Sequence, residues 1–207
     1  WSGVIDMNKA QILQELRKIK DVAFATVDSE GRPQVRIIDV MLADEETIYF
    51  CTARGKAFYH QLCEGGYVAV SGLNKQFQMF RISGRAQKLG DQRRWIDEIF
   101  NHNPSMNDVY PRDSRYILEP FCIRIEQMEW FDLGVSPICR GEISLSAEKG
   151  FVIGPNCIGC GKCMRSCPQQ CICAGSPYQI AQEHCLHCGL CAETCPVHAI
   201  LPGGEHA

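Results

Sequence analysis

Cysteines with one unusual spacing occur twice near the C-terminal end of the chain. The two stretches are CIGCGKCMRSCP, residues 157–168, and CLHCGLCAETCP, residues 185–196, and both follow the pattern C-x-x-C-x-x-C-x-x-x-C-P. Three closely spaced thiolates can wrap one face of a cubane iron-sulfur cluster while the intervening backbone amides turn inward toward its sulfurs. The fourth thiolate must come from elsewhere in the chain. The pattern predicts an iron-sulfur cluster, and its second copy predicts another.

Residues 152–201 resemble bacterial two-cluster ferredoxins, in which the cysteine before proline ligates the other cluster. The resemblance implies crossed ligation, in which each motif completes the cluster of the other. The ligands expected for one [4Fe-4S] cluster are Cys157, Cys160, Cys163 and Cys195, and those expected for the second are Cys185, Cys188, Cys191 and Cys167. The resemblance also implies one-electron transfer between two neighbouring clusters. Glycines at 159, 161 and 189 stand where tight loops benefit from the absence of a Cβ.

Zinc and disulfides are the alternative explanations for so many cysteines. A structural zinc site usually shows two well-separated pairs of ligands, not a triplet followed by C-P. The cysteines are also packed too closely for ordinary disulfide pairing. Iron-sulfur clusters are therefore the better interpretation.

The remaining cysteines lie outside the repeated pattern. They are Cys51, Cys63, Cys122, Cys139, Cys171 and Cys173. The first three fall in strand or helix patterns and are expected to be small core residues. We expect Cys171 and Cys173 to be packed or exposed loop thiols, with a role as an extra cluster ligand as the alternative, while Cys139 has no assigned role. His184 and His187 flank ligands of the second cluster and are expected to be neighbours or tuners of its potential.

Composition restricts the class of protein. The chain has 207 residues, 45% of them apolar, which is enough for a substantial core. A net charge of -3 gives no sign of a nucleic-acid or anionic-membrane partner. With no apolar run of membrane-spanning length and no signal segment, we expect a cytoplasmic protein. The opening WSGVID lacks an initiator methionine and is expected to be an added remnant ahead of Met7.

Cysteine density divides the chain into parts. Residues 1–135 hold few cysteines among ordinary alternating patterns, whereas residues 152–207 hold both motifs. Between them, residues 136–151 are rich in Gly, Ser and Pro without sustained periodicity, and are expected to form a linker. The sequence therefore predicts two domains, of which the second is a small α+β ferredoxin-like one.

The first domain shows one helix followed by strand patterns. Its N-terminal apolar stripe has helical spacing and consists of Ile12, Leu13, Leu16 and Ile19. Strands are predicted in DVAFATVD, QVRIIDVML, TIYFC, YVAVSG, QFQMFRISGRAQKL and PFCIRIEQMEWFDL, and short helices in KAFYHQLC and DQRRWIDEIF. Asp91 is the expected N-cap of the second of these helices, and Gly84 is expected to permit a bend or bulge. Strands in hairpin order favour a mainly β, α+β domain with an antiparallel barrel.

Three ordered segments of this domain, GRPQVRIIDV, IYFCTARGKAFYHQL and FRISGRAQ, look like the flavin-binding split β-barrel family typified by pyridoxamine 5'-phosphate oxidase. The resemblance covers roughly residues 8–132. It implies a six-stranded antiparallel split β-barrel with flanking helices that forms a homodimer and holds FMN in a groove at the dimer interface. Relatives of this fold carry deazaflavin or haem, which remain alternative cofactors.

The resemblance also implies which residues contact FMN. Carried over by position, Arg36, Ile37 and Ile38 lie beside the isoalloxazine ring. The phosphate group is expected at TARGK, where a cation, a hydroxyl and helix N-terminal amides converge. Its residues are Thr52 and Lys56, with Arg54 as a helper, and the weaker candidates on the long strand are Gln78 and Arg81.

The sequence departs from pyridoxamine phosphate oxidases in two respects. Their Ser-Arg-Lys phosphate signature is contracted here to TARGK, and a ferredoxin-like segment occupies the end that carries their substrate-binding residues. Both departures argue against vitamin B6 oxidation. No nucleophile constellation is present, so no catalytic residue is assigned, and no glycine-rich dinucleotide fingerprint follows a strand.

Flavins accept one or two electrons and ferredoxin clusters pass them singly. The leading hypothesis is therefore an FMN and iron-sulfur oxidoreductase that moves electrons between a low-potential donor, the clusters and FMN, and reduces a small acceptor by two electrons. An electron-transfer subunit that serves a redox partner protein, and a redox or ligand sensor, are the alternatives. Because clusters and reduced flavin react with oxygen, an anaerobic or microaerobic host is expected.

Overall fold

The structure is a computed structural model that describes residues 7–144 and 150–203. Residues 1–6, the expected remnant, lie outside the described residues. The chain divides into two compact units. Within the described residues, the larger unit comprises 7–130 and 142–144, and the smaller comprises 131–141 and 150–203.

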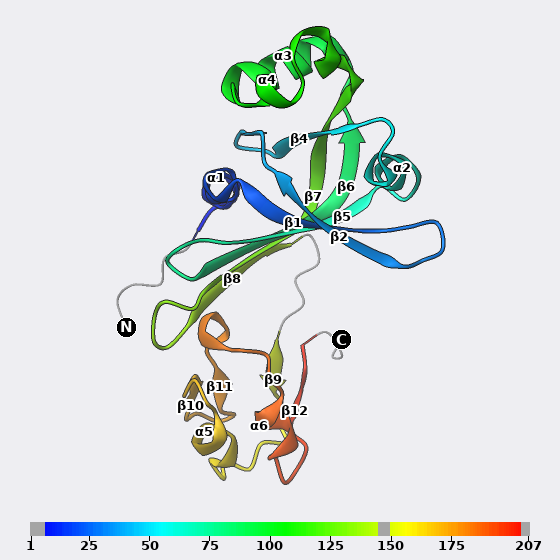
Figure 1. The fold of residues 1–207 in the computed structure, drawn as a ribbon. Helices are drawn as coiled ribbons and strands as arrows, with labels where there is room; N and C mark the ends of the chain where they lie inside the picture. Colours follow the sequence, from blue (N-terminus) through cyan, green and yellow to red (C-terminus); the bar gives the residue numbers. More distant parts are fainter. Residues whose placement is uncertain (1–6, 145–149, 204–207) are drawn as a thin grey trace. The chain divides into compact units, whose positions relative to one another are not determined.

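The larger unit is built on an antiparallel sheet (Figure 1). The strands of this sheet are β1 (Asp21–Val27), β2 (Pro33–Asp39), β3 (Leu42–Ala43), β4 (Ile48–Ala53), β5 (Tyr67–Leu73), β6 (Gln78–Lys88), β7 (Leu118–Asp132) and β8 (Cys139–Ser144). The last residues of β7, from 131, and the first residues of β8, to 141, belong to the smaller unit. Hydrogen-bonded neighbours follow the order β2-β1-β5-β6-β7-β4-β3, and β8 pairs with β7. All the strands predicted from sequence are present, so the predicted split barrel is confirmed, with β3 and β8 as additional strands.

Alternating apolar residues explain the core of this unit. On β1, Val22 and Phe24 are buried while their neighbours in sequence are exposed or half-buried. The rings of Phe24 and Phe50 lie 4.8 Å apart between centroids, and Phe50 stacks on Phe121 at 5.7 Å. Aromatic pairs of this kind contribute about 0.5–1.5 kcal/mol beyond their buried area. These rings connect β1, β4 and β7 across the barrel interior.

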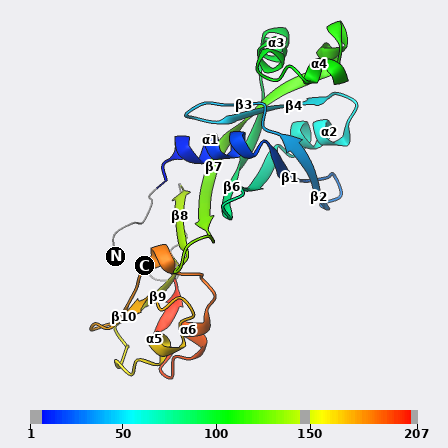
Figure 2. The ribbon, with the colours of Figure 1, turned by 60° about the vertical axis from the view of Figure 1, so that its left-hand side comes forward.

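Helices flank the sheet, as Figures 1 and 2 show. They are α1 (Lys9–Ile19), α2 (Ala57–Glu64), α3 (Gln92–His102) and α4 (Met106–Val109), with a 3-10 turn at Arg112–Ile117. The stripe predicted for α1 faces the core, and the Asn8 side chain caps the helix by accepting a hydrogen bond from the Gln11 backbone at 2.9 Å. No helix of the described chain is long and apolar enough to cross a membrane.

Asp91 precedes α3 as predicted, but its side chain makes no capping hydrogen bond. Its φ of 47° places the backbone in the left-handed region. A capping side chain normally extends from a β-region backbone toward the first free amides of the helix. The left-handed conformation at Asp91 removes that geometry, so the expected cap is wrong in its chemistry although right in its position.

The expected linker, 136–151, contains the strand β8 and the first residue of β9. Its composition is poor in strand-forming residues, yet Cys139–Ser144 pairs with β7. The reason is the length of β7, which continues for 15 residues and offers backbone groups beyond those that β4 uses. Unpaired strand edges bind another strand readily.

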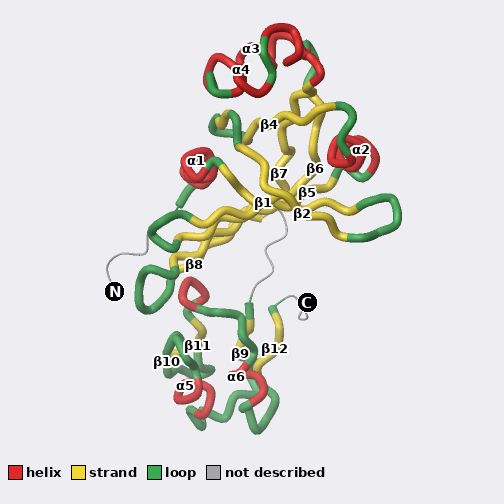
Figure 3. Tube along the Cα trace, in the orientation of Figure 1, coloured by secondary structure: helices red, strands yellow, loops and turns green. Residues whose placement is uncertain are grey.

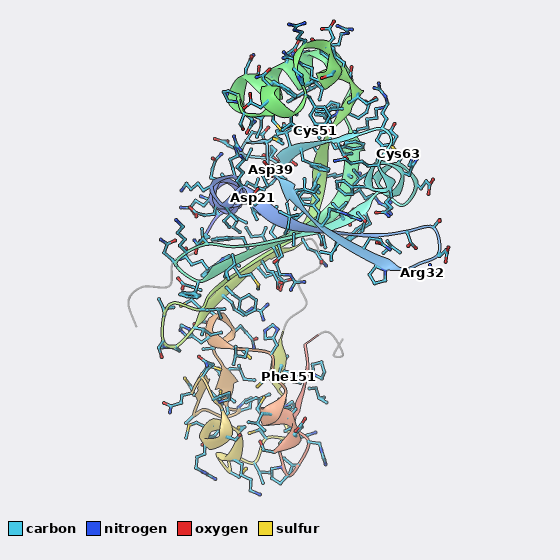
Figure 4. The ribbon with its side chains drawn as sticks, viewed as in Figure 1. Asp21, Arg32, Asp39, Cys51, Cys63 and Phe151 are labelled. Atoms are coloured by element: carbon cyan, nitrogen blue, oxygen red, sulfur yellow. The ribbon has the colours of Figure 1, made fainter. Side chains whose placement is uncertain are left out.

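The three cysteines of the larger unit differ in burial. Cys51 on β4 lies in a core with Ile96, Ile99 and other residues, and burial raises the pKa of its thiol to about 12 (Figure 4). Cys122 on β7 is half-buried, whereas Cys63 on α2 is exposed, in contrast to the expected core position. Because α2 is amphipathic and buries Phe58 and Leu62, its opposite face remains in solvent.

The smaller unit consists largely of loops (Figure 3). Its short elements are β9 (Phe151–Ile153), α5 (Lys162–Ser166), β10 (Ile172–Cys173), β11 (Gln179–Ile180), α6 (Leu190–Glu193) and β12 (Ile200–Pro202), with a 3-10 turn at Gln182–His184. β9 pairs with β12, and β10 pairs with β11. Its apolar core contains Ile153, Ile172 and Ile200 together with several cysteines. The predicted small α+β domain is confirmed.

Gly84 stands where β6 passes close to β7. A Cβ at this position would lie 2.1 Å from the Arg124 carbonyl oxygen, which is backbone and cannot rotate away. Gly84 is therefore required by the close approach of two strands at the centre of the sheet.

Replacing Gly84 with Ala should lower the free energy of unfolding by about 1–3 kcal/mol, because the added methyl group must separate β6 from β7. Gly90→Ala is the matched control, since a Cβ there meets nothing within 4 Å. Urea unfolding of both variants measures the difference. Equal stabilities for the two variants would contradict the packing argument.

Candidate metal and cofactor sites

Four cysteines line one cavity of the smaller unit. They are Cys157, Cys160, Cys163 and Cys195. The cavity has a volume of about 320 Å³ including its open mouth, and Tyr178 and Ile158 contribute to its wall. Three of the thiols come from the first motif and one comes from the second. The structure thus brings together the set predicted for the first cluster.

A second cavity, of about 340 Å³, is lined by five cysteines. They are Cys167, Cys171, Cys185, Cys188 and Cys191. Four of them are the set predicted for the second cluster, and Phe151 forms part of the wall. Cys171, expected to be a packed or exposed loop thiol with an extra ligand as the alternative, is 5% exposed and lines the same space. Among the described residues, no group of three His, Cys, Asp or Glu side chains lies close enough together to bind a single metal ion.

Each cavity depends on a tight turn in its motif. Gly161 and Gly189 have φ values of 68° and 80°, and they precede α5 and α6 respectively. A left-handed residue before each helix reverses the chain and places Cys163 and Cys191 in the first helical turn. Residues with a Cβ rarely adopt this conformation, which explains glycine at both positions.

Burial affects the protonation of the thiols, and backbone amides contact two of their sulfurs. Burial raises the pKa of Cys191 to about 11 and raises that of Cys163. Without metal these thiols keep their protons at neutral pH, so loading an iron-sulfur cluster releases protons. Backbone amides already point at two sulfurs, from His187 to Cys185 Sγ at 3.4 Å and from Ala199 to Cys195 Sγ at 3.3 Å. Such hydrogen bonds stabilise thiolates and tune cluster potential.

His184 is buried beside the second cavity. Its Nδ1 lies 3.0 Å from the Ile138 carbonyl oxygen and 3.9 Å from Cys139 Sγ. Cys139, which had no role assigned from the sequence, therefore lies beside His184, the residue before the predicted cluster ligand Cys185. The Ile138 amide donates to the Gln169 side chain at 3.2 Å, so the segment before β8 packs on residues that flank Cys167 and Cys185.

The predicted phosphate residues gather where β4 meets α2 in the larger unit. Thr52 is 3% exposed, and its Oγ1 has no hydrogen-bond partner among the described residues. Arg54 follows at the end of the strand, and Lys56 occupies the N-cap position of α2 with an exposed side chain. A buried hydroxyl without a partner costs free energy unless a ligand completes it. The Thr52, Arg54 and Lys56 set therefore fits a phosphate group.

Two residues at this junction were missed by sequence reasoning. Glu119 on β7 lies directly opposite Thr52 and is 5% exposed. Its carboxylate lies 2.9 Å from Arg54 Nη1 and 3.1 Å from Lys88 Nζ. The hydrogen bond to Glu119 raises the pKa of Lys88. Glu119 is brought to Thr52 by the pairing of β4 with β7, and this pairing could not be predicted from the sequence.

Arg36 packs against α2. Its guanidinium donates to Thr26 Oγ1 at 2.5 Å and to Gln61 Oε1 at 2.8 Å, and lies 4.6 Å from the centroid of the Phe58 ring. Burial lowers its pKa. Ile37 points to the other face of β2, because successive side chains of a strand alternate, and it is 64% exposed.

Ile38 shares the face of Arg36, lies opposite Val22 on β1 and is half-buried. Arg36 and Ile37 therefore cannot present their side chains to the same surface. A ligand on one face of β2 could therefore contact the side chains of Arg36 and Ile38 or the side chain of Ile37, but not all three. It could contact the backbone of all three residues.

Gln78 and Arg81 lie elsewhere. Gln78 begins β6 and accepts a hydrogen bond from the Asn74 side chain at 2.9 Å, while Arg81 forms an ion pair with Glu129 on β7. Lys88, beside the phosphate residues, ends the same strand. Since strands rise about 3.3 Å per residue, Gln78 and Lys88 are about 30 Å apart. One copy of the chain does not bring Gln78 or Arg81 to the β4–α2 junction.

An open apolar face covers part of β1, β2 and β5. Val35 and Ile37, paired with Ala25 and Ala23, are 72% and 64% exposed. Beside them lies a groove of about 600 Å³ including open space. It is lined by Ala25, Thr26, Val27, Pro33, Gly65, Tyr67 and Ala69. Contiguous exposed apolar surface of this kind marks a binding or interaction site.

The fold and the cysteine cavities define a class of protein, in which a split barrel of the FMN-binding type is joined to a 4Fe-4S dicluster domain. The chain belongs to the pyridoxamine 5'-phosphate oxidase family, whose sequence pattern matches residues 9–113, just over half of the chain. The pattern of the 4Fe-4S dicluster domain matches residues 156–199. Both family resemblances proposed from sequence are confirmed.

Solved structures share the barrel fold. A NimC/NimA family protein from Clostridium acetobutylicum has a TM-score of 0.52 at 23% identity, covering 66% of this chain and 93% of that chain. PhzG from Burkholderia lata in complex with tetrahydrophenazine-1-carboxylic acid has a TM-score of 0.50 at 19% identity, covering 65% and 80%. A heme binding protein from Mycobacterium smegmatis has a TM-score of 0.51 at 12% identity, covering 68% and 60%. No curated protein matches the chain.

Replacing Thr52 with Val should weaken FMN binding about tenfold, because one hydrogen bond to a charged phosphate is lost. The stability of the flavin-free protein should stay equal or rise, since the hydroxyl has no partner to lose. Flavin fluorescence titration and urea unfolding measure the two effects.

Thr47→Val is the matched control. Thr47 Oγ1 donates to the Ile123 carbonyl at 2.6 Å and accepts from the Ile123 amide at 3.1 Å. This variant should lose about 1–3 kcal/mol of stability without a change in FMN affinity. If Thr52→Val behaved like Thr47→Val, the phosphate assignment would be wrong.

Replacing Cys195 with Ala tests the crossed ligation. The first cluster, held otherwise by residues of the first motif, should be lost or degraded, while the second cluster is retained. Iron analysis and electron paramagnetic resonance (EPR) of the reduced protein distinguish the two clusters. Selective damage to the cluster of Cys185, Cys188 and Cys191 would refute crossing.

Proposed function

We propose that this chain is an FMN and iron-sulfur oxidoreductase. Electrons pass between a low-potential donor, two [4Fe-4S] clusters and FMN, and a small acceptor is reduced by two electrons. The observation that carries the proposal is the presence, in one chain, of two cavities lined by cysteines and a barrel with an unpartnered buried hydroxyl at a cationic strand-to-helix junction.

The protein residues have definable tasks in this function. The cysteines of each cavity supply four thiolates to one cluster. The buried ligands, Cys163 at the first cavity and Cys185 and Cys191 at the second, exclude water from the inner face of each cluster. Clusters supply one-electron steps and FMN supplies the exchange between one and two electrons. Thr52 offers a hydroxyl to the phosphate, and Lys56 adds an exposed positive charge at the N-terminus of α2.

Glu119 sets the charge at the same place. It lies between Arg54 and Lys88 and holds both cations against β7. Without a ligand the carboxylate neutralises part of their charge, and a phosphate group would share the same two cations. Lys88 also contacts Tyr59 OH at 3.3 Å, which fixes its ammonium group on α2. These residues position positive charge where a dianion would bind.

We also propose that the barrel forms a homodimer, and that the occupant of the open apolar face is a second copy of the chain. The exposed apolar side chains of Val35 and Ile37 would be removed from water by a second copy that binds this face. Gln78 and Arg81 lie too far from Lys88 along β6 to serve the same phosphate site in one chain. A second copy is the way these residues could contribute to a shared flavin site.

An electron-transfer subunit is the second candidate. Ile158 and Leu186 each follow the first cysteine of a motif and are 64% and 38% exposed. Apolar side chains exposed beside each cysteine cavity fit a weak docking surface for a redox partner protein. In this case electrons would leave through the clusters and no small acceptor would be reduced.

Cofactor analysis of anaerobically purified protein tests the proposal. About eight irons and one FMN per chain are expected, and the reduced protein should pass electrons to small two-electron acceptors. Full cofactor content without turnover on any small acceptor would favour the electron-transfer subunit. Haem or deazaflavin in place of FMN, or absence of iron, would contradict the proposal.

A further inference from the structure

The two cysteine motifs are followed by the same turn. After Cys167, the amide of Gln170 donates to the Cys167 carbonyl at 3.1 Å, and after Cys195 the amide of His198 donates to the Cys195 carbonyl at 3.3 Å. Gln170 and His198 have φ values of 51° and 50°. Residues with a Cβ rarely adopt this conformation. The repeated turn therefore returns the chain toward the cavity in both motifs.

The next residue differs between the motifs. Cys171 follows the first turn and is 5% exposed, and Ala199 follows the second and is 4% exposed. Cys171 lines the second cavity and Ala199 lines the first. The two positions are structurally equivalent, but only one of them carries a thiol. The second cavity consequently has five cysteines and the first has four.

Cys171 is within reach of the ligand position of Cys167. The two Sγ atoms lie 3.5 Å apart. Both thiols face the space that Cys185, Cys188 and Cys191 also line. A shift of a few ångströms, within the range of a side-chain rotation, would exchange one sulfur for the other at the same iron. The backbone is already in place, because the Cys171 carbonyl accepts a hydrogen bond from the Ala181 amide at 2.8 Å.

We propose that Cys171 is a reserve ligand of the second cluster, able to replace Cys167. The proposal rests on the two-cluster assignment of the proposed function. In the exchange, the iron-sulfur bond to Cys167 breaks and Cys167 takes up a proton, while Cys171 gives up its proton and forms the new bond. No electron is transferred. The first cluster has no such reserve, because alanine occupies the equivalent position.

This asymmetry changes how the two clusters tolerate damage. Loss of the Cys167 ligand would leave the second cluster with a complete set of four thiolates, because Cys171 takes its place. Loss of the Cys195 ligand would leave the first cluster with three. The second cluster should therefore survive loss of its C-P cysteine, and the first should not.

Anaerobically prepared variants of the full chain test the proposal by iron analysis and by EPR of the reduced protein. The variants at the second cluster are Cys167→Ala, Cys171→Ala and the double variant. Each single variant should keep about eight irons, with altered EPR signals only in Cys167→Ala, and the double variant should lose up to about four. Loss of the second cluster in Cys167→Ala overturns the proposal. An iron content in this variant that is no higher than in the double variant also overturns it.

The first cluster offers a matched gain of function. Cys195→Ala should lose the first cluster, and adding Ala199→Cys to that variant should restore it. Iron that stays absent in the combined variant would show that the position after the turn cannot supply a ligand, against the proposal. Wild-type protein without about eight irons would instead overturn the proposed function itself.

Discussion

Each cysteine cavity of the smaller unit contains three thiols of one motif and one thiol of the other motif. This crossed arrangement constrains the fold of the rest of the unit. Cys195 can reach the first cavity, and Cys167 the second, only when both motifs fold side by side. Among the described residues of this unit, the buried core cluster holds three large apolar residues, Ile153, Ile172 and Ile200, and its other buried members are cysteines. Small domains with so little core need staples such as metal sites. Metal loading and folding of this unit are therefore expected to be coupled.

The larger unit is organised differently, since its stability comes from a conventional aromatic core. This leaves the β4–α2 junction free to hold groups that do not stabilise the fold. The unpartnered Thr52 hydroxyl is such a group. The buried Glu119 carboxylate lies opposite it and forms ion pairs with Arg54 and Lys88. Buried polar atoms without partners are rare in folded proteins and commonly mark functional sites. The chemistry of the junction and the family of the chain both support the ligand site proposed there.

Much of this organisation could be predicted from the sequence. The cysteine spacing is local, so the pattern indicated the three closely spaced thiols of each motif, and the resemblance to two-cluster ferredoxins implied the fourth. Alternating apolar residues indicated six of the barrel strands. The misses depend on contacts between distant segments. Glu119 and Lys88 become neighbours of Thr52 only through the order and register of β4, β6 and β7. For Cys171, the turn after Cys167 decides that it faces the cavity, and no propensity of its neighbours signals that turn.

The proposed function requires that the clusters and the flavin exchange electrons within one assembly. Rapid photoreduction of the clusters under anaerobic conditions, followed by flavin absorbance, tests it most directly. The flavin should be reduced at a rate that is independent of protein concentration, and the clusters should be reoxidised at the same rate. A flavin that stays oxidised while the clusters remain reduced, or a rate proportional to protein concentration, would contradict it.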